Sequence, residues 1–522
     1  MKKNNNFLKS KFCAALLAGG FCSLAFAPFH FFIAAPISLS VFYFLLEEKD
    51  KKKDIFWLGF SYGFGYFLSG IYWIAISLLV DVASFGWLIP FALTLIPSAL
   101  AAYVVLFALC YKFIIRKFSL NQTYQKIILF SVCWLFFEIL RSLLFTGFPW
   151  NLLGYIWMFD VSFAQAAKVF GIYGLSVFAV LISLSPTLFF RNKKTAGDKI
   201  FATILVCLFI GNFVFGYIYI NKTELVEDDK VKLRLVQGNV AQGMKWNPEE
   251  KYRNFTKHIE LTNSESLEDI AAVIWSETSV PYAIDDNSEL MEKLQMAVPP
   301  RGVLITGGLR LGFFDKEKTR LSDAWNSVFT IDKSGIIAVY DKHHLVPFGE
   351  YIPWQKYLPF IEKITEGAVG FSEGEGAQTL QAHAFSFSPL ICYEVIFSDE
   401  VLNKKSRPDL LVNVTNDAWF GNSSGPYQHL DIARMRTIEY GIPMVRVANT
   451  GITAFIDPFG KIVERINLNQ TGIIDVNLIK NLAPTIYEKY SFLPLTLLVV
   501  VMLLFLITPK GQKNVTRKNH TN

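Results

Sequence analysis

The chain has 522 residues, of which 52% are hydrophobic and 15% aromatic, and its formal net charge is only +6. With a mean hydropathy of +0.34, it is too apolar for a soluble globular protein of this length. Most of the clustered Lys and Arg flank apolar runs, which indicates membrane topology rather than a nucleic-acid partner. Apolar residues concentrate before residue 221 and after residue 491, and the mixed segment between is long enough for a core of its own.

The chain begins with a lysine-rich segment, which is followed by the apolar run 12–29. Ala25-Phe26-Ala27 mimics the small-x-small cleavage site of a signal peptide, but Pro28 directly after it would obstruct cleavage. Further apolar runs follow, so we expect a retained membrane helix here.

Seven more apolar runs follow along the chain, and two of them, 55–79 and 82–111, are long and uncharged in the manner of transmembrane helices. We expect a polytopic α-helical membrane bundle of about eight helices, with seven helices in residues 1–220 and one in the C-terminal segment 492–522. The expected spans are 12–29, 31–46, 55–79, 82–111, 127–145, 173–190, 200–220 and 492–508.

Lys and Arg cluster in every second connection between these spans, whereas the connections around His30, around Asp81 and across 146–172 hold only Lys168. The positive-inside rule places the basic connections, and with them both termini, in the cytoplasm. By the same alternation, the segment 221–491 lies outside the cytoplasm, in the periplasm or its equivalent. The basic clusters are 1–11, 49–53, 112–126, 191–199 and 510–518.

Glu138 and Arg141 lie three residues apart in the fifth expected span, on one face of a helix where they can pair. Charges inside a membrane are costly, so the two residues either have a direct function or lock helices together as a neutral pair. The aromatic turn Thr146–Asn151 follows them. We expect this turn to anchor the chain at the outer membrane face, with a route for lipid as the alternative.

From residue 232 onward, short β-rich runs alternate with polar, helix-compatible stretches. Many of these runs are wholly apolar, which indicates an α/β domain over 221–491 with sheets covered by helices. No Gly-rich phosphate loop and no His/Cys spacing suited to zinc is present, so we expect neither a metal nor a cofactor. The expected strands are 233–237, 272–275, 303–306, 327–332, 336–340, 390–393, 410–414, 444–448, 454–456 and 473–476, and the expected helices are 248–264, 288–297 and 428–440.

Cys392 is the only cysteine of the polar segment, because the other five lie in apolar runs. It closes a short apolar run and stands two residues before Glu394, which makes it a candidate nucleophile. The residue type alone leaves a plainer alternative, a buried cysteine that acts as a small hydrophobe.

Two other polar residues also follow apolar strands. Glu277 closes the run 272–277, and Lys342 follows the run 337–341. Taken singly, each fits an ordinary solvated strand end. Together with Cys392, however, they can converge on one rim of a sheet, where they supply a general base, a cation and a thiol.

The Glu277, Lys342 and Cys392 arrangement resembles that of the nitrilase (carbon–nitrogen hydrolase) superfamily, whose fold is an α-β-β-α sandwich. The chain as a whole, spans included, is similar to the apolipoprotein N-acyltransferase family of integral membrane enzymes, which acylate bacterial lipoproteins. The stretches that carry the resemblance are 237–239, 245–246, 275–281, 325–327, 340–351, 391–394, 416–421 and 434–436, together with the outer turn 146–150.

The resemblance implies a ping-pong acyl transfer between two membrane-held substrates. The Cys392 thiolate attacks the sn-1 ester of a membrane phospholipid and forms a thioester. The α-amino group of an N-terminal diacylglyceryl-cysteine of an apolipoprotein then takes the acyl chain. Glu277 is expected to be the general base and Lys342 the cation for the oxyanion. The residues expected to support them are Glu350, Glu394 and Asn326, and those expected to bind the acyl chain are Trp246, Tyr393, Trp419 and Trp150.

Two other functions stay open on the residues. A membrane-anchored amidase would hydrolyse a small amide with the same three side chains, and a lipid-binding scaffold would need no catalysis. Eight spans exceed what tethering requires, and the intact Glu277, Lys342 and Cys392 argue against the scaffold. We expect a multi-pass enzyme of the bacterial cytoplasmic (inner) membrane that acts as a monomer, with phospholipid and apolipoprotein as partners and no nucleic acid.

Overall fold

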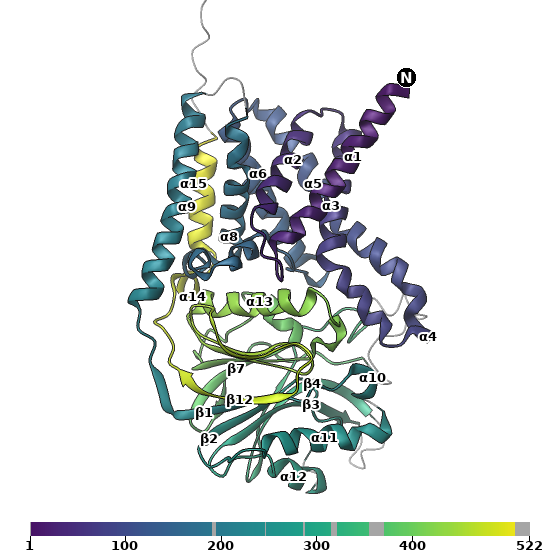
Figure 1. Cartoon of the computed structure of the whole chain (residues 1–522), viewed down its shortest axis with the longest axis vertical. Coiled ribbons are helices and arrows are strands. Elements are labelled where there is room, and N and C mark those ends of the chain that lie inside the picture. Colours follow the sequence, from purple (N-terminus) through teal and green to yellow (C-terminus); the bar gives the residue numbers. More distant parts are fainter. Residues whose placement is uncertain are drawn as a thin grey trace, which may run out of the picture.

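The computed structural model describes residues 2–190, 195–245, 247–285, 288–314, 321–353 and 370–506. A bundle of helices forms one end of its long axis and an α/β domain forms the other (Figure 1). Trp246, one of the residues expected to bind the acyl chain, and the basic cluster 510–518 lie outside the described residues.

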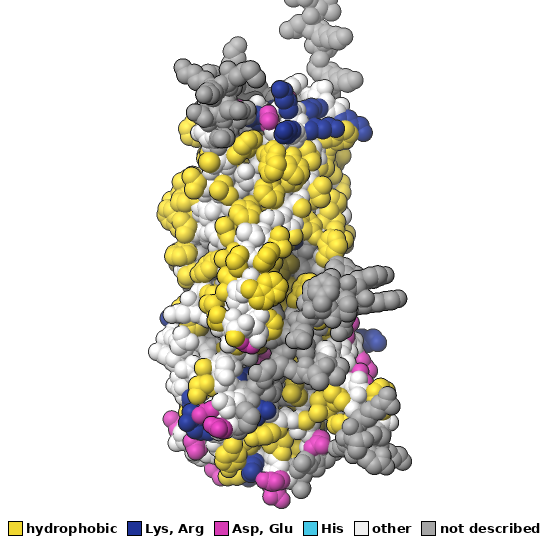
Figure 2. Space-filling model, turned by 90° about the vertical axis from the view of Figure 1, so that its right-hand side faces the viewer, with side chains coloured by type: hydrophobic (Ala, Val, Ile, Leu, Met, Phe, Trp, Pro, Cys, Tyr) yellow, Lys and Arg dark blue, Asp and Glu magenta, His cyan; other side chains and the backbone are white. Residues whose placement is uncertain are grey.

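The bundle carries a belt of exposed apolar side chains, and Lys and Arg side chains gather at the end remote from the α/β domain (Figure 2). Short 3₁₀ segments interrupt or extend several of its helices, among them η2 (Tyr72–Leu79) and η5 (Leu153–Phe159). The helices are α1 (Lys2–Cys22), α2 (Ala34–Glu47), α3 (Lys52–Ile71), α4 (Val82–Phe85), α5 (Ile89–Phe118), α6 (Thr123–Leu143), α7 (Val161–Ala164), α8 (Ala167–Leu184), α9 (Ala196–Lys222) and α15 (Leu493–Leu504).

In the described part of the chain, five helical stretches are long and apolar enough to cross a membrane, and three shorter apolar helices accompany them. The expected polytopic membrane bundle is therefore present, with shifted bounds. The first span, expected over 12–29, ends at Cys22, and the sixth, expected over 173–190, already begins at Ala167 with a break at Gly171. The five long stretches are Lys52–Leu79, Val82–Phe118, Thr123–Thr146, Ala167–Leu188 and Ala196–Lys222, and the shorter ones are Ser10–Ala25, Ala34–Glu47 and Leu493–Leu504.

The α/β domain contains two six-stranded sheets, with strand orders β12-β1-β2-β3-β4-β5 and β11-β10-β9-β8-β7-β6. Parallel pairs such as β1–β2, β2–β3, β7–β8 and β8–β9 form the middle, and antiparallel pairs complete the edges. The strands are β1 (Glu227–Gln237), β2 (Ile270–Trp275), β3 (Val303–Phe313), β4 (Leu321–Asp332), β5 (Gly335–Asp341), β6 (Leu380–Ala382), β7 (Phe385–Ile391), β8 (Leu410–Thr415), β9 (Met444–Ala448), β10 (Thr453–Ile456), β11 (Ile462–Ile466) and β12 (Gly472–Ile479).

The two sheets are covered by helices on their outer faces, which gives the expected α-β-β-α sandwich (Figure 1). Leu235, Val412 and Val445 belong to the buried apolar cluster between the sheets. A second cluster lies under the helices at the far end of the molecule, and includes Phe255 and Leu294. The domain's helices are α10 (Gln242–Lys245), α11 (Pro248–Thr262), α12 (Ser288–Gln295), α13 (Gly425–Tyr440) and α14 (Ile486–Tyr490).

Helix α13 lies between the second sheet and the membrane bundle (Figure 1). Its apolar residues share one buried cluster with bundle helices, and Leu430, Ile432 and Ile438 are at most 5% exposed. The bundle therefore packs directly against the α/β domain through this helix, and the two share one contiguous core.

The local structure differs from the expected one at the strand before Cys392 and in four short elements. The strand expected over 390–393 ends at Ile391, because Cys392 has a positive φ of 50° and opens the 3₁₀ turn η7 (Cys392–Ile396). Strands β6 and β11 and the short helices α10 and α14 were not expected. Strand β11 exposes Val463, Glu464 and Arg465 on an edge, so it lacks an apolar pattern.

Candidate active site

Glu277, Lys342 and Cys392 follow the carboxyl ends of three strands. β2 and β5 run in the same direction within the first sheet, since β2 is parallel to β3 and two antiparallel pairs connect β3 to β5. β7 belongs to the facing sheet. The three side chains thus reach one end of the sandwich from both layers, and all three residues are at most 8% exposed.

A chain of hydrogen bonds connects the two charged residues of the first sheet. The Lys342 Nζ donates to Glu350 Oε1 at 2.9 Å. Asn326 Nδ2 donates to Glu277 Oε1 at 2.7 Å and to Glu350 Oε1 at 3.1 Å, so one amide links both carboxylates. The backbone N–H of Val346 binds the other Glu350 oxygen at 2.8 Å. These bonds fix the carboxylates before any substrate arrives.

The electrostatics of the site keep the lysine charged and the thiol protonated. Burial acts to lower the pKa of Lys342, but Glu350 and Glu277 outweigh it and hold that pKa above its usual range. Burial raises the pKa of Glu277 although Lys342 opposes it. Burial, and next the Glu277 carboxylate, raise the pKa of the Cys392 thiol to about 12, against the opposing charge of Lys342.

Buried polar residues hold the backbone of Cys392 in its conformation with positive φ. His429 Nε2 lies 3.2 Å from the Cys392 carbonyl oxygen, and its Nδ1 lies 3.0 Å from Asp417 Oδ1. Arg446 Nη2 donates to Asp417 Oδ2 at 2.7 Å. All three of these residues are buried. A positive φ on a residue with a side chain is strained and persists only where its surroundings enforce it.

Glu394 joins the ends of β5 and β7. One of its oxygens accepts from the N–H of Ile391 at 2.6 Å, and the other from the N–H of His343 at 2.8 Å and the Tyr340 hydroxyl at 2.8 Å. Burial acts to raise the pKa of Glu394, but the bonds from His343 and Ile391 hold it below its usual range. Glu394 therefore connects the two sheets beside Cys392 as a carboxylate.

Lys245 is a site residue for which sequence reasoning assigned no role. Its buried ammonium donates to the Glu277 carbonyl oxygen at 3.0 Å and to the Thr278 hydroxyl. Burial lowers the pKa of Lys245 to about 8, although Glu277 and Cys392 favour its charge. His429, Asp417 and Arg446 had no assigned role either. The one available signal was Arg446, a charge within an otherwise apolar expected strand, which requires a buried partner.

Three of the four residues expected to bind the acyl chain lie in the described part of the chain, and each has its own contacts. The Tyr393 hydroxyl donates to the carbonyl oxygen of Gly147 at 3.0 Å, across the boundary between domain and bundle. Trp150 is buried and donates to Gln428 Oε1 at 2.7 Å. Its ring packs 4.7 Å from Trp73 and 5.4 Å from His429. Trp419 is half-buried in η8 (Asp417–Phe420).

Glu138 and Arg141 make their hydrogen bonds separately. Glu138 Oε1 accepts from Trp134 Nε1 at 3.0 Å and from the N–H of Leu153 at 2.9 Å. Arg141 Nη1 donates to the carbonyl oxygens of Phe148 and, at 2.7 Å, Trp150. Both residues therefore hold the chain that follows their helix, and within the described structure no hydrogen bond or salt bridge joins them as the neutral pair that was one of the two expected roles.

Among the described residues, no group of three or more His, Cys, Asp and Glu side chains is arranged to hold a metal ion. The chemistry available at the site is that of a thiol, a carboxylate base and a fixed cation. Such a set suits nucleophilic acyl transfer through a covalent intermediate.

Comparison with known proteins gives matches over both parts of the chain. The family model for the apolipoprotein N-acyltransferase N-terminal domain matches residues 18–185, and the carbon-nitrogen hydrolase model matches residues 232–486. The apolipoprotein N-acyltransferase of Rickettsia prowazekii (strain Madrid E) is 37% identical over 94% of this chain and 96% of its own length. That of Rhodopseudomonas palustris (strain ATCC BAA-98 / CGA009) is 36% identical over 95% and 94%. A solved CN-hydrolase superfamily protein from Xanthomonas campestris covers 48% of this chain and 90% of its own, with 17% identity and a TM-score of 0.36.

Proposed function

Since the chain belongs to the apolipoprotein N-acyltransferase family, it is a membrane acyltransferase that modifies lipoproteins, and we propose its donor, its acceptor and its catalytic residues. The donor is the sn-1 ester of a membrane phospholipid. The acceptor is the α-amino group of the N-terminal diacylglyceryl-cysteine of an apolipoprotein. The observation that carries this proposal is the hydrogen-bonded network of Lys342, Glu350, Asn326 and Glu277 at the strand ends that face Cys392.

In the first half-reaction, the Cys392 sulfur attacks the ester carbonyl carbon while its proton moves to Glu277. A carbon–sulfur bond forms, the ester carbon–oxygen bond breaks, and Glu277 returns the proton to the departing alkoxide of the lysophospholipid. In the second half-reaction, the neutral amine attacks the thioester. A carbon–nitrogen bond forms, the carbon–sulfur bond of the thioester breaks, and the proton that the amine loses returns through Glu277 to the released Cys392 sulfur.

Lys342 stabilises the negative oxygen that develops in both tetrahedral intermediates. Its ammonium is already charged and fixed by Glu350 at 2.9 Å, so it needs little reorganisation during the reaction. Asn326 holds Glu277 in place by its hydrogen bond, and Glu394 fixes the backbone at Ile391, directly before Cys392. Tyr393, Trp150, Trp419 and Trp246 are proposed to border the acyl chain, since aromatic side chains offer large apolar faces.

We propose the same topology that the charge pattern indicates, with both termini cytoplasmic and a periplasmic catalytic domain over 221–491 at the inner membrane. The connections poor in Lys and Arg contact the α/β domain, which supports their being on its side of the membrane. His30 Nε2 lies 3.4 Å from Asp431 Oδ2, and His344 Nε2 lies 2.9 Å from the Thr146 carbonyl oxygen. Figure 2 shows Lys and Arg at the opposite end, as the positive-inside rule requires.

The decisive experiment traps the acyl-enzyme. The full-length protein in lipid nanodiscs, incubated with phospholipid labelled in its sn-1 chain and no acceptor, should acquire a hydroxylamine-sensitive label on Cys392. Cys392→Ser should lose the label, Glu277→Gln should acquire it slowly, and Lys342→Ala should lose roughly 10²–10³ in rate.

Cys207→Ser is the matched control, because this exposed cysteine of α9 lies in the bundle, away from the strand ends. It should be labelled like the unmodified protein. Acyl transfer to a lipopeptide amine by Cys392→Ser at the unmodified rate would refute the proposed nucleophile. Transfer without a detectable acyl-enzyme in any variant would refute the ping-pong order.

A further inference from the structure

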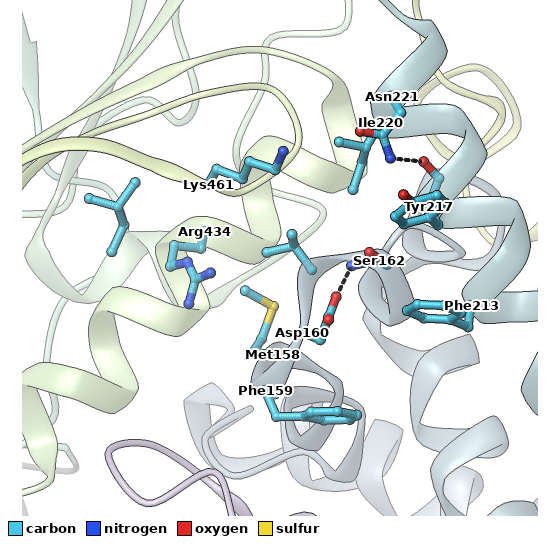
Figure 3. Close-up of a pocket in the computed structure, with 12 residues that line it drawn as sticks. Met158, Phe159, Asp160, Ser162, Phe213, Tyr217, Ile220, Asn221, Arg434 and Lys461 are labelled. Atoms are coloured by element: carbon cyan, nitrogen blue, oxygen red, sulfur yellow. Dashed lines mark hydrogen bonds between the residues drawn. The ribbon is translucent and has the colours of Figure 1, made fainter.

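A cavity of about 570 Å³ lies where the bundle meets the α/β domain, and it contains none of the residues of the proposed catalytic network. Its walls come from the end of α9, from η5 and α7, from α13 and from the start of β11, as Figure 3 shows. Four segments far apart in the sequence thus enclose one space, and neither catalysis nor the sandwich core accounts for it.

The cavity has two cations. Arg434 Nη1 donates to Asp431 Oδ1 at 2.8 Å and Nε to the Gly460 carbonyl oxygen at 2.8 Å, which orients the guanidinium and leaves Nη2 without a hydrogen bond to the described residues. The exposed Lys461 ammonium has no carboxylate of the described chain within ion-pairing distance. A fixed guanidinium and an exposed ammonium, whose charge also acts on the nearby Asp457, border the same cavity and form a suitable receptor for a phosphate group.

The carboxylate of Asp160 also lines this cavity. Asp160 Oδ1 accepts the N–H of Ser162 at 2.8 Å, which caps α7. In Figure 3 the Asp160 side chain points into the cavity, toward the region between Met158 and Ser162. Two cations and one anion suit a ligand that carries a phosphate together with an amine better than a simple dianion.

The cavity also has the position and the walls of a lipid site. Along α9 the side chains of Val214, Phe215 and Ile218 are exposed and apolar, as lipid-facing residues are, and the helix then ends at Asn221 and Lys222. The cavity opens at that end, beside Phe213 and Tyr217. This is the level at which an apolar belt gives way to polar headgroups.

From these observations we propose that the cavity binds the phosphodiester headgroup of a membrane phospholipid, at a site separate from the reacting cysteine. Arg434 and Lys461 hold the phosphate, Asp160 favours headgroups that carry an amine, and Phe213 packs against the upper part of the acyl chains. The proposal does not depend on which residue performs acyl transfer, since the test below measures binding in a protein without its thiol nucleophile.

The test uses full-length protein with Cys392→Ser, in detergent micelles that contain a phosphatidylethanolamine with a photoreactive diazirine near the acyl carbonyl. After illumination, mass spectrometry should find the label on peptides that contain Phe213 and Tyr217 or Met158. Unlabelled phosphatidylethanolamine and phosphatidylglycerol should compete, and diacylglycerol with the same chains should not. Lys461→Glu should lower labelling about tenfold or more, as expected for the loss of a charged hydrogen bond.

Two comparisons sharpen the result. Lys405→Glu makes the same charge change at an exposed site in the α/β domain that does not line the cavity, and should leave labelling unchanged. Asp160→Asn keeps the helix cap, because Asn caps as well as Asp, and should remove the preference for phosphatidylethanolamine over phosphatidylglycerol. Labelling unaffected by Lys461→Glu, or equal competition by diacylglycerol, would overturn the proposal. Competition by millimolar inorganic phosphate as strong as that by phospholipid would assign the site to the free anion and overturn the lipid.

Discussion

Cys392 keeps its proton at neutral pH in the resting protein, because burial and the Glu277 carboxylate raise its pKa to about 12. A thiol that reacts as a thiolate must therefore transfer its proton during the reaction. Glu277 can receive it, since burial raises the pKa of that carboxyl as well. In the proposed mechanism, the thiolate therefore forms only when an ester is in place, which would protect the cysteine from unwanted chemistry.

This arrangement predicts opposite effects of Glu277→Gln on two reactions. Removal of the carboxylate charge lowers the thiol pKa, so a larger fraction of Cys392 is thiolate and alkylation by iodoacetamide should be several-fold faster at pH 8. The proton acceptor is lost at the same time, so formation of the acyl-enzyme should be slower. Both rates are measured by mass spectrometry of the Cys392 peptide.

Background alkylation is controlled with a parent protein that lacks Cys13 and Cys207, the two exposed cysteines. Glu249→Gln, a neutralisation at an exposed position at the start of α11, should change neither rate. If Glu277→Gln slows both alkylation and acylation, the carboxylate activates the thiol in the resting protein as well, and the account given above is wrong.

His343 predicts a pH dependence of stability. Its ring lies 2.8 Å from Glu394 Oε1 and 3.2 Å from Glu400 Oε2. Burial acts to lower its pKa, but the bonds to Glu394 and Glu400 raise it to about 10. Because the folded-state pKa exceeds the unfolded value, the stabilisation is complete below pH 6.5 and is lost as the pH approaches 10. The difference in Tm between the wild type and His343→Gln should therefore be largest at pH 6 and shrink by pH 10.

Thermal unfolding in detergent, followed by tryptophan fluorescence at several pH values, measures this difference. His383→Gln removes an imidazole that is 48% exposed in its side chain and reaches only Asp332, so it controls for general effects of pH. A difference for His343→Gln that stays constant from pH 6 to pH 10 would contradict a charged imidazole at this position.

For single residues, the sequence predicts the site residues that end strands. It does not predict the buried residues that form hydrogen bonds to them. Glu277, Lys342 and Cys392 each follow an apolar run, so their convergence could be inferred together with the family resemblance. Lys245 and His429 could not, because their partners lie 32 and 37 residues away along the chain and only the fold brings them together. The catalytic roles of the three residues stay predictions.

Among the elements, the turn 146–150 has more contacts than an interfacial anchor needs. Arg141 binds the carbonyl oxygens of Phe148 and Trp150 from the bundle side. From the domain side, Tyr393 binds the Gly147 carbonyl oxygen and His344 approaches that of Thr146. The turn thus connects a membrane helix to Tyr393, the residue beside Cys392.

Arg141→Leu should therefore impair acyl transfer from a distance. Loss of the two charged hydrogen bonds, each about 1.5–3 kcal/mol, frees the turn and with it Tyr393. Acyl-enzyme formation should fall about tenfold or more, mostly in kcat, and Tm should fall. Arg116→Leu, at the far end of the bundle where Arg116 binds Asp50, should leave the rate unchanged.

A double variant tests the separate roles of Glu138 and Arg141. Because each binds its own backbone groups, Glu138→Gln with Arg141→Leu should be at least as impaired as the worse single variant. A double variant that recovers activity would show that the two charges act as one neutral pair.

The strands of the sandwich were predictable because they are buried apolar runs, and their order in the sheets was not. The short edge strand β6 and the exposed β11 have no such pattern. The predicted helix bounds in the bundle were wrong where the backbone conformation of a single residue interrupts a helix. Gly171 breaks α8 with a φ of +63°, and a Cβ there would lie 2.5 Å from the Tyr487 ring, so a larger residue does not fit.

At the scale of the whole molecule, the charge alternation makes a prediction about orientation. Single cysteines at positions 249 and 405, both exposed, should react with an impermeant maleimide added outside intact cells. Cysteines at positions 52 and 196 should react only after the cells are permeabilised. The parent protein again lacks Cys13 and Cys207. Protection of position 249 in intact cells would refute a periplasmic catalytic domain.

Helix α13 has partners on two faces, in the second sheet and in the bundle, and this limits how the protein can be divided. One of its faces packs on the second sheet, and the other gives hydrogen bonds to the bundle. Gln428 accepts from Trp73 and Trp150, Arg436 donates to Tyr155 at 3.1 Å, and Glu439 accepts the N–H of Ile172 at 2.7 Å. Helix α13 thus belongs to the packed interior of both the α/β domain and the membrane bundle.

An excised, water-soluble version of the α/β domain would therefore lose the contacts that the bundle makes with α13. Leu430 and Ile432 would meet water, and the buried Arg436 and Glu439 would lose partners that a single-pass anchor cannot supply. The membrane bundle therefore covers part of the core of the α/β domain. Chimeras with soluble amidases should be joined outside the ends of α13, so that the helix and the bundle segments that contact it are transferred together.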